Sequence, residues 1–264
     1  MSRRKEAIPV DGSVSIEPRF RAAIVIPVYN HEEAIGPTLA SVLEYGYPVL
    51  LVDDGSSPVC RDVLMSLDQQ YDDRVRLIRL AQNSGKGAAV KAGLRHLLAL
   101  DYTHAVQIDA DGQHDLTDLP TFMATGQREP DALVTGYPRY DESVPALRYY
   151  ARYLTHVWVW INTLSLRIKD TMCGFRVYPL AKVVELLDQE PCGNRMDFDP
   201  EVIVRWAWRG FAVENLPTQV RYPIDGVSHF NAIKDNVLIS LMHARLFFGM
   251  LVRLPKILSN RRHG

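Results

Sequence analysis

Short apolar runs alternate with segments of helical periodicity between Ala22 and Gly136, and this alternation limits the folds that the chain can adopt. Five runs have the length and composition of buried strands: AAIVIPV, VLLVDDGS, VRLIRL, HAVQID and DALVTG. Helices are expected between them, so the sequence predicts an α/β fold in which helices cover both faces of a mostly parallel sheet. Ligands bind to such sheets beyond the carboxyl ends of the strands.

Polar, turn-forming residues follow the first four strands of this expected sheet. They occupy, in chain order, positions 29–30, 53–56, 83–86 and 109–111. Because parallel strands place their carboxyl ends along one rim, we expect these residues to form a single polar site.

Asp109 and Asp111 stand one residue apart directly after a strand that is expected to be buried. Two like charges about 4 Å apart at an effective dielectric near 20 repel by about 4 kcal/mol, so a cation is expected between them. Alone, the pattern D-x-D is common and usually marks a solvated turn. On the rim of a parallel sheet it indicates a site for Mg²⁺ or Mn²⁺, which bind few carboxylates together with the phosphates of a substrate.

The other polar segments of the rim allow more than one interpretation. Asp54 is either a turn residue that caps the next helix or a hydrogen-bonding partner of a nucleobase or ribose. The segment NSGKG matches neither G-x-x-x-x-G-K-[ST] nor G-x-G-x-x-G, yet Lys86 at a helix N-terminus can approach an anion. Asn30 and Glu33 have the spacing of a capping box, which predicts a helix that begins directly after Asn30.

Six segments, in order, resemble the motifs of family 2 glycosyltransferases: IVIPVYN, VDDGS, NSGKGAAVKAG, DADGQH, DTMCGFRVY and FDPEV. The resemblance covers about residues 22–230 and is closest to the branch of dolichyl-phosphate mannose synthases and bacterial polyprenyl-phosphate glycosyltransferases. It implies a glycosyltransferase A fold with a Rossmann-like sheet, a GDP- or UDP-sugar donor and an inverting reaction. One residue departs from the pattern, because His31 stands where many relatives have a glutamate.

The resemblance also implies roles for individual residues of the rim. Asp109, Asp111 and Gln113 would hold Mg²⁺ or Mn²⁺ on the donor diphosphate, which places Asp111 among the catalytic residues. Ser228 and His229 belong to a loop that is expected to fold over the donor. The implied nucleotide site consists of Pro27, Tyr29, Asn30, Asp54, Lys86 and Asp109.

The second half of the chain is expected to bind the acceptor. In the polyprenyl-phosphate branch, arginines bind the phosphate of the acceptor, and such pairs are strong and bidentate. Arg139, Arg152 (or Arg148) and Arg221 stand where those arginines would be. The alternative for each is an ordinary surface arginine.

An acceptor phosphate is already ionised near neutral pH and needs no base, whereas a hydroxyl acceptor needs a carboxylate within hydrogen-bond reach. Asp199 is the best candidate for such a catalytic base, and Asp197 is the second. The alternative is that Asp199, followed by a proline, caps the next helix.

The segment 236–252 is predicted to be an interfacial amphipathic helix. It is shorter than the roughly 20 apolar residues that a membrane span needs, and it contains His243 and Arg245. With a basic tail, it predicts peripheral contact with the cytoplasmic face of a membrane. Residues 147–168 carry a helical apolar stripe. The expected organisation is a disordered leader (1–20), a catalytic domain (21–233) with a nucleotide-sugar half (21–136) and an acceptor half (137–233), and the helix with its tail (234–264).

Composition removes several functional classes. The formal net charge of −1 provides no field that favours nucleic acid, and three widely spaced cysteines argue against a disulfide framework or a Cys-rich zinc site. The resemblance to family 2 glycosyltransferases implies a metal-dependent, inverting glycosyltransferase with a lipid-linked acceptor, for which polyprenyl phosphate is the expectation. A hydroxyl acceptor served by Asp199 is the alternative, and a non-catalytic nucleotide-sugar scaffold is the alternative from another class. The sugar, the base and the oligomeric state do not follow from the sequence.

Overall fold

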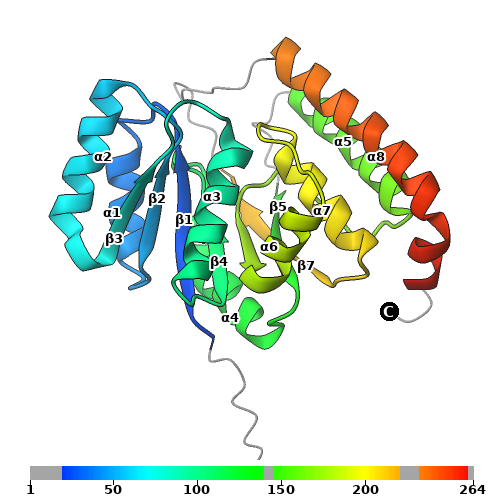
Figure 1. Ribbon diagram of the computed structural model, residues 1–264, viewed down its shortest axis with the longest axis horizontal. Helices are drawn as coiled ribbons and strands as arrows, with labels where there is room; N and C mark the ends of the chain where they lie inside the picture. The colour runs from blue at the N-terminus through cyan, green and yellow to red at the C-terminus, as the bar shows by residue number, and fades with distance from the viewer. Residues whose placement is uncertain (1–19, 140–145, 221–231, 261–264) are drawn as a thin grey trace, which may run out of the picture.

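The computed structural model describes residues 20–139, 146–220 and 232–260, and within the helices the side chains of 146–154 and 232–233 lie outside the description. In this part of the chain, seven strands form one sheet in the order β3-β2-β1-β4-β6-β5-β7 (Figure 1). The strands are β1 (Ala22–Val28), β2 (Val49–Asp53), β3 (Val75–Arg79), β4 (His104–Gln107), β5 (Leu133–Arg139), β6 (Arg176–Pro179) and β7 (Val213–Gln219).

Helices cover both faces of the sheet (Figure 1). They are α1 (Ile35–Leu43), α2 (Pro58–Tyr71), α3 (Lys86–Ala99), α4 (Leu119–Arg128), α5 (Ala146–Thr163), α6 (Leu180–Gln189), α7 (Phe198–Trp208) and α8 (Ala232–Asn260), with short 3₁₀ turns η1 (Asp72–Arg74) and η2 (Leu116–Asp118). The helices α1, α2 and α4 share one hydrophobic core with one face of the sheet, and α3, α6 and α7 share a second core with the other face.

The alternation of side chains along β1 explains the two cores. Val25 points into the core under α3, whereas Ile24 and Ile26 point into the core under α1. Gly93 of α3 faces Val25 so closely that a Cβ at this position would overlap its side chain. The missing side chain lets α3 lie directly on the sheet, which places the N-terminus of α3 at the rim.

The mostly parallel α/β sheet predicted from the sequence is confirmed. β1, β2, β3 and β4 pair in parallel, so the four polar segments do meet along one rim. β6 runs antiparallel to both of its neighbours, β4 and β5, and the apolar pattern of the sequence did not predict this direction. The division into a leader and two halves stays a prediction, and residues 1–19 lie outside the described part.

Two helix boundaries differ from the sequence-based prediction. α1 begins at Ile35 without a side-chain cap, so the predicted capping box of Asn30 and Glu33 is wrong. Asn30 has a positive φ of 51°, and its Oδ1 instead accepts a hydrogen bond from the amide of Ser57 at 2.8 Å. α5 ends at Thr163, before the end of the apolar stripe, because Leu164 turns into the left-handed region with φ 52°.

The C-terminal helix α8 is longer than predicted. Its portion Lys234–Asn260 has 27 residues and contains an 18-residue window with a mean hydropathy of 1.6, which by length and composition alone is enough to cross a membrane. The whole helix therefore has the length that the segment 236–252 lacks. α8 lies along α5 in Figure 1, and its inner face is buried against the domain through Met242, Leu246 and Met250.

Candidate active site

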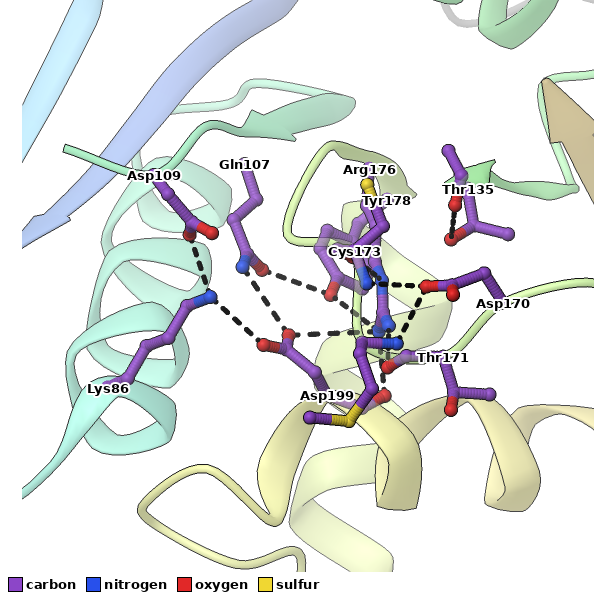
Figure 2. A network of polar contacts seen from close by, with 12 residues as sticks. Lys86, Gln107, Asp109, Thr135, Asp170, Thr171, Cys173, Arg176, Tyr178 and Asp199 are labelled. Carbon is purple, nitrogen blue, oxygen red and sulfur yellow. Dashed lines mark hydrogen bonds and ion pairs between the residues drawn. The ribbon is translucent and has the colours of Figure 1, made fainter. Parts of the chain in front are cut away.

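Lys86 joins the two halves of the chain at the rim. Its Nζ lies 2.7 Å from Oδ1 of Asp109 and 3.1 Å from Oδ2 of Asp199 (Figure 2). Lys86 is the first residue of α3, Asp109 follows β4, and Asp199 lies in the first turn of α7. Gly85, with φ 102°, precedes the helix and turns the chain so that the lysine enters at its N-terminus. One cation thus bridges carboxylates from the predicted donor and acceptor halves.

Asp199 is held by further polar groups. Its Oδ1 accepts a hydrogen bond from Nε2 of Gln107 at 3.4 Å and lies 3.8 Å from Nη1 of Arg176. The hydroxyl of Tyr178 donates to Oε1 of Gln107 at 3.1 Å, which orients the amide toward Asp199. The carboxylate therefore faces two cations and an amide donor, and only 7% of its side chain is exposed.

Arg176 contacts both the side chain and the backbone of Asp199. It is fully buried in β6 and donates to the backbone carbonyls of Thr171 (2.6 Å), Cys173 (3.0 Å) and Asp199 (2.8 Å). A buried charge is tolerated only when it is paired and hydrogen-bonded, and these three carbonyls together with the Asp199 carboxylate meet that condition. Asp170 lies three residues before Cys173, and its Oδ1 accepts hydrogen bonds from the amides of Met172 and Cys173.

The charges of Lys86 and Asp109 stabilise each other. Burial opposes ionisation of both groups, but the Asp109 and Asp199 carboxylates raise the pKa of Lys86 above its usual range. The Lys86 ammonium and then His114 hold the pKa of Asp109 well below its usual range, although burial acts in the opposite direction. Both groups are therefore charged across the physiological pH range.

The space around Asp109 is shaped by Gly174 and His114. A Cβ at Gly174 would overlap the Asp109 carboxylate, so glycine at this position makes room for it. His114 packs on Phe175 with ring centroids 5.5 Å apart, and its Nε2 lies 3.4 Å from Oδ2 of Asp109. The other ring nitrogen, Nδ1, is buried without a hydrogen-bond partner among the described residues. Sequence reasoning missed His114, although it follows Gln113 directly in DADGQH.

Asp111 lies beside this cluster on the turn that Gly112 makes with φ 69°. Its Oδ1 accepts from the amide of Gln113 at 3.1 Å. Burial and the charge of Asp109 raise the pKa of Asp111. The ionised form of Asp111 is therefore disfavoured beside Asp109, and a bound cation would stabilise it.

The residues of this turn fit a hard divalent cation. Carboxylate and amide oxygens of Asp109, Asp111 and Gln113 suit Mg²⁺ or Mn²⁺, and the unpartnered Nδ1 of His114 marks an incomplete polar environment among the described residues. In the described residues, no three His, Cys, Asp or Glu side chains group closely enough to hold a metal ion. A bound cation would thus need phosphate or water oxygens to complete its ligand shell, which is usual for Mg²⁺.

Asp54 fixes the loop that precedes α3. It is 2% exposed, and its two carboxylate oxygens accept from the amides of Ser84 and Gly85, each at 2.8 Å. Burial raises the pKa of Asp54, while these two amides lower it. Both oxygens are engaged by the loop, so its contact with a base or ribose stays a prediction. Of the other predicted nucleotide residues, Pro27 is buried in β1, and Tyr29 and Asn30 follow it at the rim.

Among the predicted acceptor arginines, the side chain of Arg139 lies within the described part of the structure. Arg139 is exposed at the end of β5 and lines a polar hollow with Asp115 and Asp118. Arg148 and Arg152 belong to α5, but their side chains lie outside the description. The remaining predicted residues, Arg221, Ser228 and His229, lie outside the described residues altogether.

The alternative that Asp199 caps α7 is wrong. Asp197 is the N-cap residue of this helix and makes no side-chain cap, and its Oδ1 accepts from the amide of Arg195 at 3.1 Å. The Asp199 side chain points away from the helix end toward Lys86 (Figure 2).

Known proteins share this chain's sequence and architecture. A family model described as Glycosyl transferase family 2 matches residues 23–202. A dolichyl-phosphate beta-glucosyltransferase from Mus musculus is 30% identical over 66% of this chain and 58% of its own length. A polyprenol monophosphomannose synthase from Mycolicibacterium smegmatis is 28% identical over 77% of this chain and 78% of its own length.

One solved structure shows the same fold. A glucosyl-3-phosphoglycerate synthase from Mycobacterium tuberculosis superimposes with a TM-score of 0.58 at 17% identity, covering 89% of this chain and 80% of that protein. The expected glycosyltransferase A fold is confirmed. The chain spans little more than half the length of some curated relatives, 58% of the mouse protein and 53% of a dolichyl-phosphate beta-glucosyltransferase from Dictyostelium discoideum.

Replacement of Lys86 tests the bridge between the halves. We expect Lys86→Met to lower the free energy of unfolding by about 2–4 kcal/mol, because it leaves Asp109 and Asp199 without their shared cation. The control is Lys182→Met, which removes a more exposed ion pair with Asp131 and should change stability by less than about 1 kcal/mol. Urea unfolding followed by circular dichroism measures both, and equal losses would contradict the bridge.

Proposed function

The chain belongs to glycosyl transferase family 2, and we propose that it transfers a sugar from a nucleotide-sugar donor to the phosphate of a polyprenyl phosphate. The state of Asp199 carries this proposal. In a hydroxyl acceptor site a carboxylate must be available to take the proton. Here the Asp199 carboxylate already faces Lys86, Gln107 and the buried Arg176, which favours a reaction that needs no base.

The names of the relatives agree with a lipid phosphate as acceptor. The mouse relative is named for dolichyl phosphate and the Mycolicibacterium smegmatis relative for polyprenol monophosphate. An acceptor of this class presents an ionised oxygen to the sugar at neutral pH. Its oxygen would form the new bond to the anomeric carbon while the bond to the donor diphosphate breaks. The electron pair of the broken bond would leave with the nucleoside diphosphate, and the configuration at the anomeric carbon would be inverted.

The rim residues would bind and orient the donor. Asp109, Asp111 and Gln113 would hold Mg²⁺ or Mn²⁺, which supplies Lewis-acid stabilisation of the leaving diphosphate when it is bound. Lys86, at the N-terminus of α3, would place a second positive charge beside the phosphates. Asp54 would keep the loop of Ser84 and Gly85 in the shape that the nucleotide meets.

Nucleotide binding tests the donor site. We expect GDP or UDP to bind with micromolar affinity in the presence of Mn²⁺, and binding to fall at least about tenfold in Asp111→Ala or with chelator, because the diphosphate loses its counter-charge. Isothermal calorimetry measures both nucleotides in turn. Asp62→Ala, which removes an exposed carboxylate on α2, is the control and should bind like wild type. No binding of either nucleotide to the wild type would favour the scaffold alternative.

Asp199→Asn separates the two acceptor classes. The asparagine keeps an oxygen for Lys86 but cannot take a proton. With a phosphate acceptor we expect kcat to fall by less than about tenfold, whereas loss of a general base removes about 10²–10⁴-fold. Steady-state assays with polyprenyl phosphate and with polyprenol measure the rate, and thermal unfolding confirms that the variant is folded. Transfer by the wild type to polyprenol and not to polyprenyl phosphate, lost by more than about a hundredfold in folded Asp199→Asn, would favour a hydroxyl acceptor with Asp199 as base.

We further propose that the outer face of α8 contacts the membrane that holds the acceptor. This face is apolar and exposed, and it consists of Val237, Leu241, Phe248, Leu251, Val252 and Leu258. The opposite face packs on the domain through Met242, Leu246 and Met250, and His243 is buried against Asn162 of α5. Arg245, itself 54% exposed, pairs with the buried Glu201 at 2.7 Å. A helix with one face packed and the other apolar suits an orientation along the membrane surface.

Charged substitutions on the outer face of α8 test this contact. We expect Phe248→Asp with Val252→Asp to reduce sedimentation with phosphatidylglycerol vesicles by at least about tenfold, because two exposed apolar side chains lose their burial in lipid. The control is Val59→Asp on α2, where an exposed valine lies away from α8. Unchanged sedimentation of the double variant would contradict a peripheral contact through this face.

A further inference from the structure

The loop between α6 and α7, residues 190–197, reaches across to the donor rim. The carbonyl of Asn194 accepts from the amide of Ala88 in the first turn of α3 at 2.9 Å. A Cβ on Gly85 would overlap both this carbonyl and the side chain of Arg195. The second half of the chain therefore lies in direct contact with the loop that Asp54 holds in place.

Lys91 anchors this loop from α3. Its Nζ donates to the carbonyls of Cys192 (2.8 Å) and Gly193 (3.1 Å) and to Oδ1 of Asn194 (2.6 Å). These three acceptors occupy the three N–H groups of the ammonium. On the other side, the amide of Gly193 donates to the buried Glu201 at 2.8 Å. The 190–197 loop is thus held against the rim by hydrogen bonds to Lys91 and Glu201.

The loop presents one cation to the rim. Arg195 is exposed, and its Nη1 donates to Oδ1 of Asn83 at 3.3 Å. This bond uses one of the five N–H groups of the guanidinium. The positive charge also acts on Asp54, whose pKa it lowers against the larger effect of burial. Arg195 therefore lies where β2 and β3 end.

The order of the strands separates this cation from the diphosphate side of the rim. β3 and β2 lie on one side of β1, whereas β4, which leads to Asp109 and Asp111, lies on the other. Neighbouring strands are about 4.8 Å apart, so a nucleotide with its diphosphate at the end of β4 has its base toward the ends of β2 and β3. Arg195 and Asn83 stand on the side of the base.

We propose that Arg195 contacts the nucleobase of the donor and that Lys91 is the positioning residue that holds it there. This inference rests on the proposed function. Guanine presents O6 and N7, and uracil presents carbonyl oxygens, so either base offers acceptors to the guanidinium. An ordinary surface arginine would leave nucleotide affinity unchanged, and a contact with the β-phosphate would act only on diphosphates. A contact with the base would act on the monophosphate and the diphosphate alike.

Titration of nucleotides into the 264-residue chain with Mn²⁺ tests the contact. We use GMP and GDP, and UMP and UDP, with wild type, Arg195→Ala and Arg195→Lys. In Arg195→Ala we expect the dissociation constants of the monophosphate and the diphosphate of the preferred base to rise by a similar factor of at least about ten. Arg195→Lys should recover part of this loss. The control Arg95→Ala removes an exposed arginine of α3 that pairs with Asp188, and it should bind like wild type.

Lys91 is tested by its dependence on Arg195. Lys91→Met should weaken nucleotide binding, Lys91→Arg should restore part of it, and Lys91→Met added to Arg195→Ala should cause little further loss. A purely structural role would lower the thermal unfolding temperature without this non-additivity.

Three outcomes would overturn the inference. If the wild type binds nucleotide and Arg195→Ala binds it with the same affinity, the inference is overturned and the proposed function is unaffected. A loss confined to the diphosphates would assign Arg195 to the diphosphate and overturn the contact with the base. Failure of the wild type to bind any of the four nucleotides would overturn the proposed function and this inference with it.

Discussion

The ammonium group of Lys86 between Asp109 and Asp199 is the contact on which the arrangement of the site depends. Three separate elements meet at this contact. α3 supplies the lysine, the end of β4 supplies Asp109, and α7 supplies Asp199. Each carboxylate would be costly to bury with its charge unpaired, and each is stabilised by sharing the same cation. The rim of the sheet is therefore joined to α7 by electrostatics as well as by packing.

The sequence was sufficient for the local features of this site and insufficient for its long-range contacts. The periodicity of the sequence predicted five strands of a mostly parallel sheet, with a polar rim after the first four, because both features depend on residues close together in the chain. The approach of Asp199 to Lys86 depends on how α7 packs against α3, for which the sequence has no local signal. The predicted capping box failed for the same reason, because Asn30 bonds to Ser57 on the next strand end rather than to its own helix.

The C-terminal helix shows a different limit of sequence reasoning. The sequence defines an apolar segment, 236–252, that is too short to cross a membrane. The helix α8 extends beyond this segment at both ends, so its length no longer argues against a membrane span. Burial separates its two faces where hydropathy could not. Leu246 is fully buried and Phe248, two residues later, is 66% exposed. The apolar residues of α8 therefore divide into a buried face that packs on α5 and an exposed outer face.

The buried polar groups around Asp199 bear directly on the chemistry. A carboxylate that acts as a base must release its existing partners and accept a proton, and here those partners include Lys86 and a fully buried arginine. Protonation of Asp199 would remove one of the two carboxylates that Lys86 contacts and the carboxylate that Arg176 faces. The proposed phosphate acceptor avoids this step, because its oxygen is already ionised near neutral pH. The proposal of a lipid phosphate over a hydroxyl thus rests on how the charges of this site are paired.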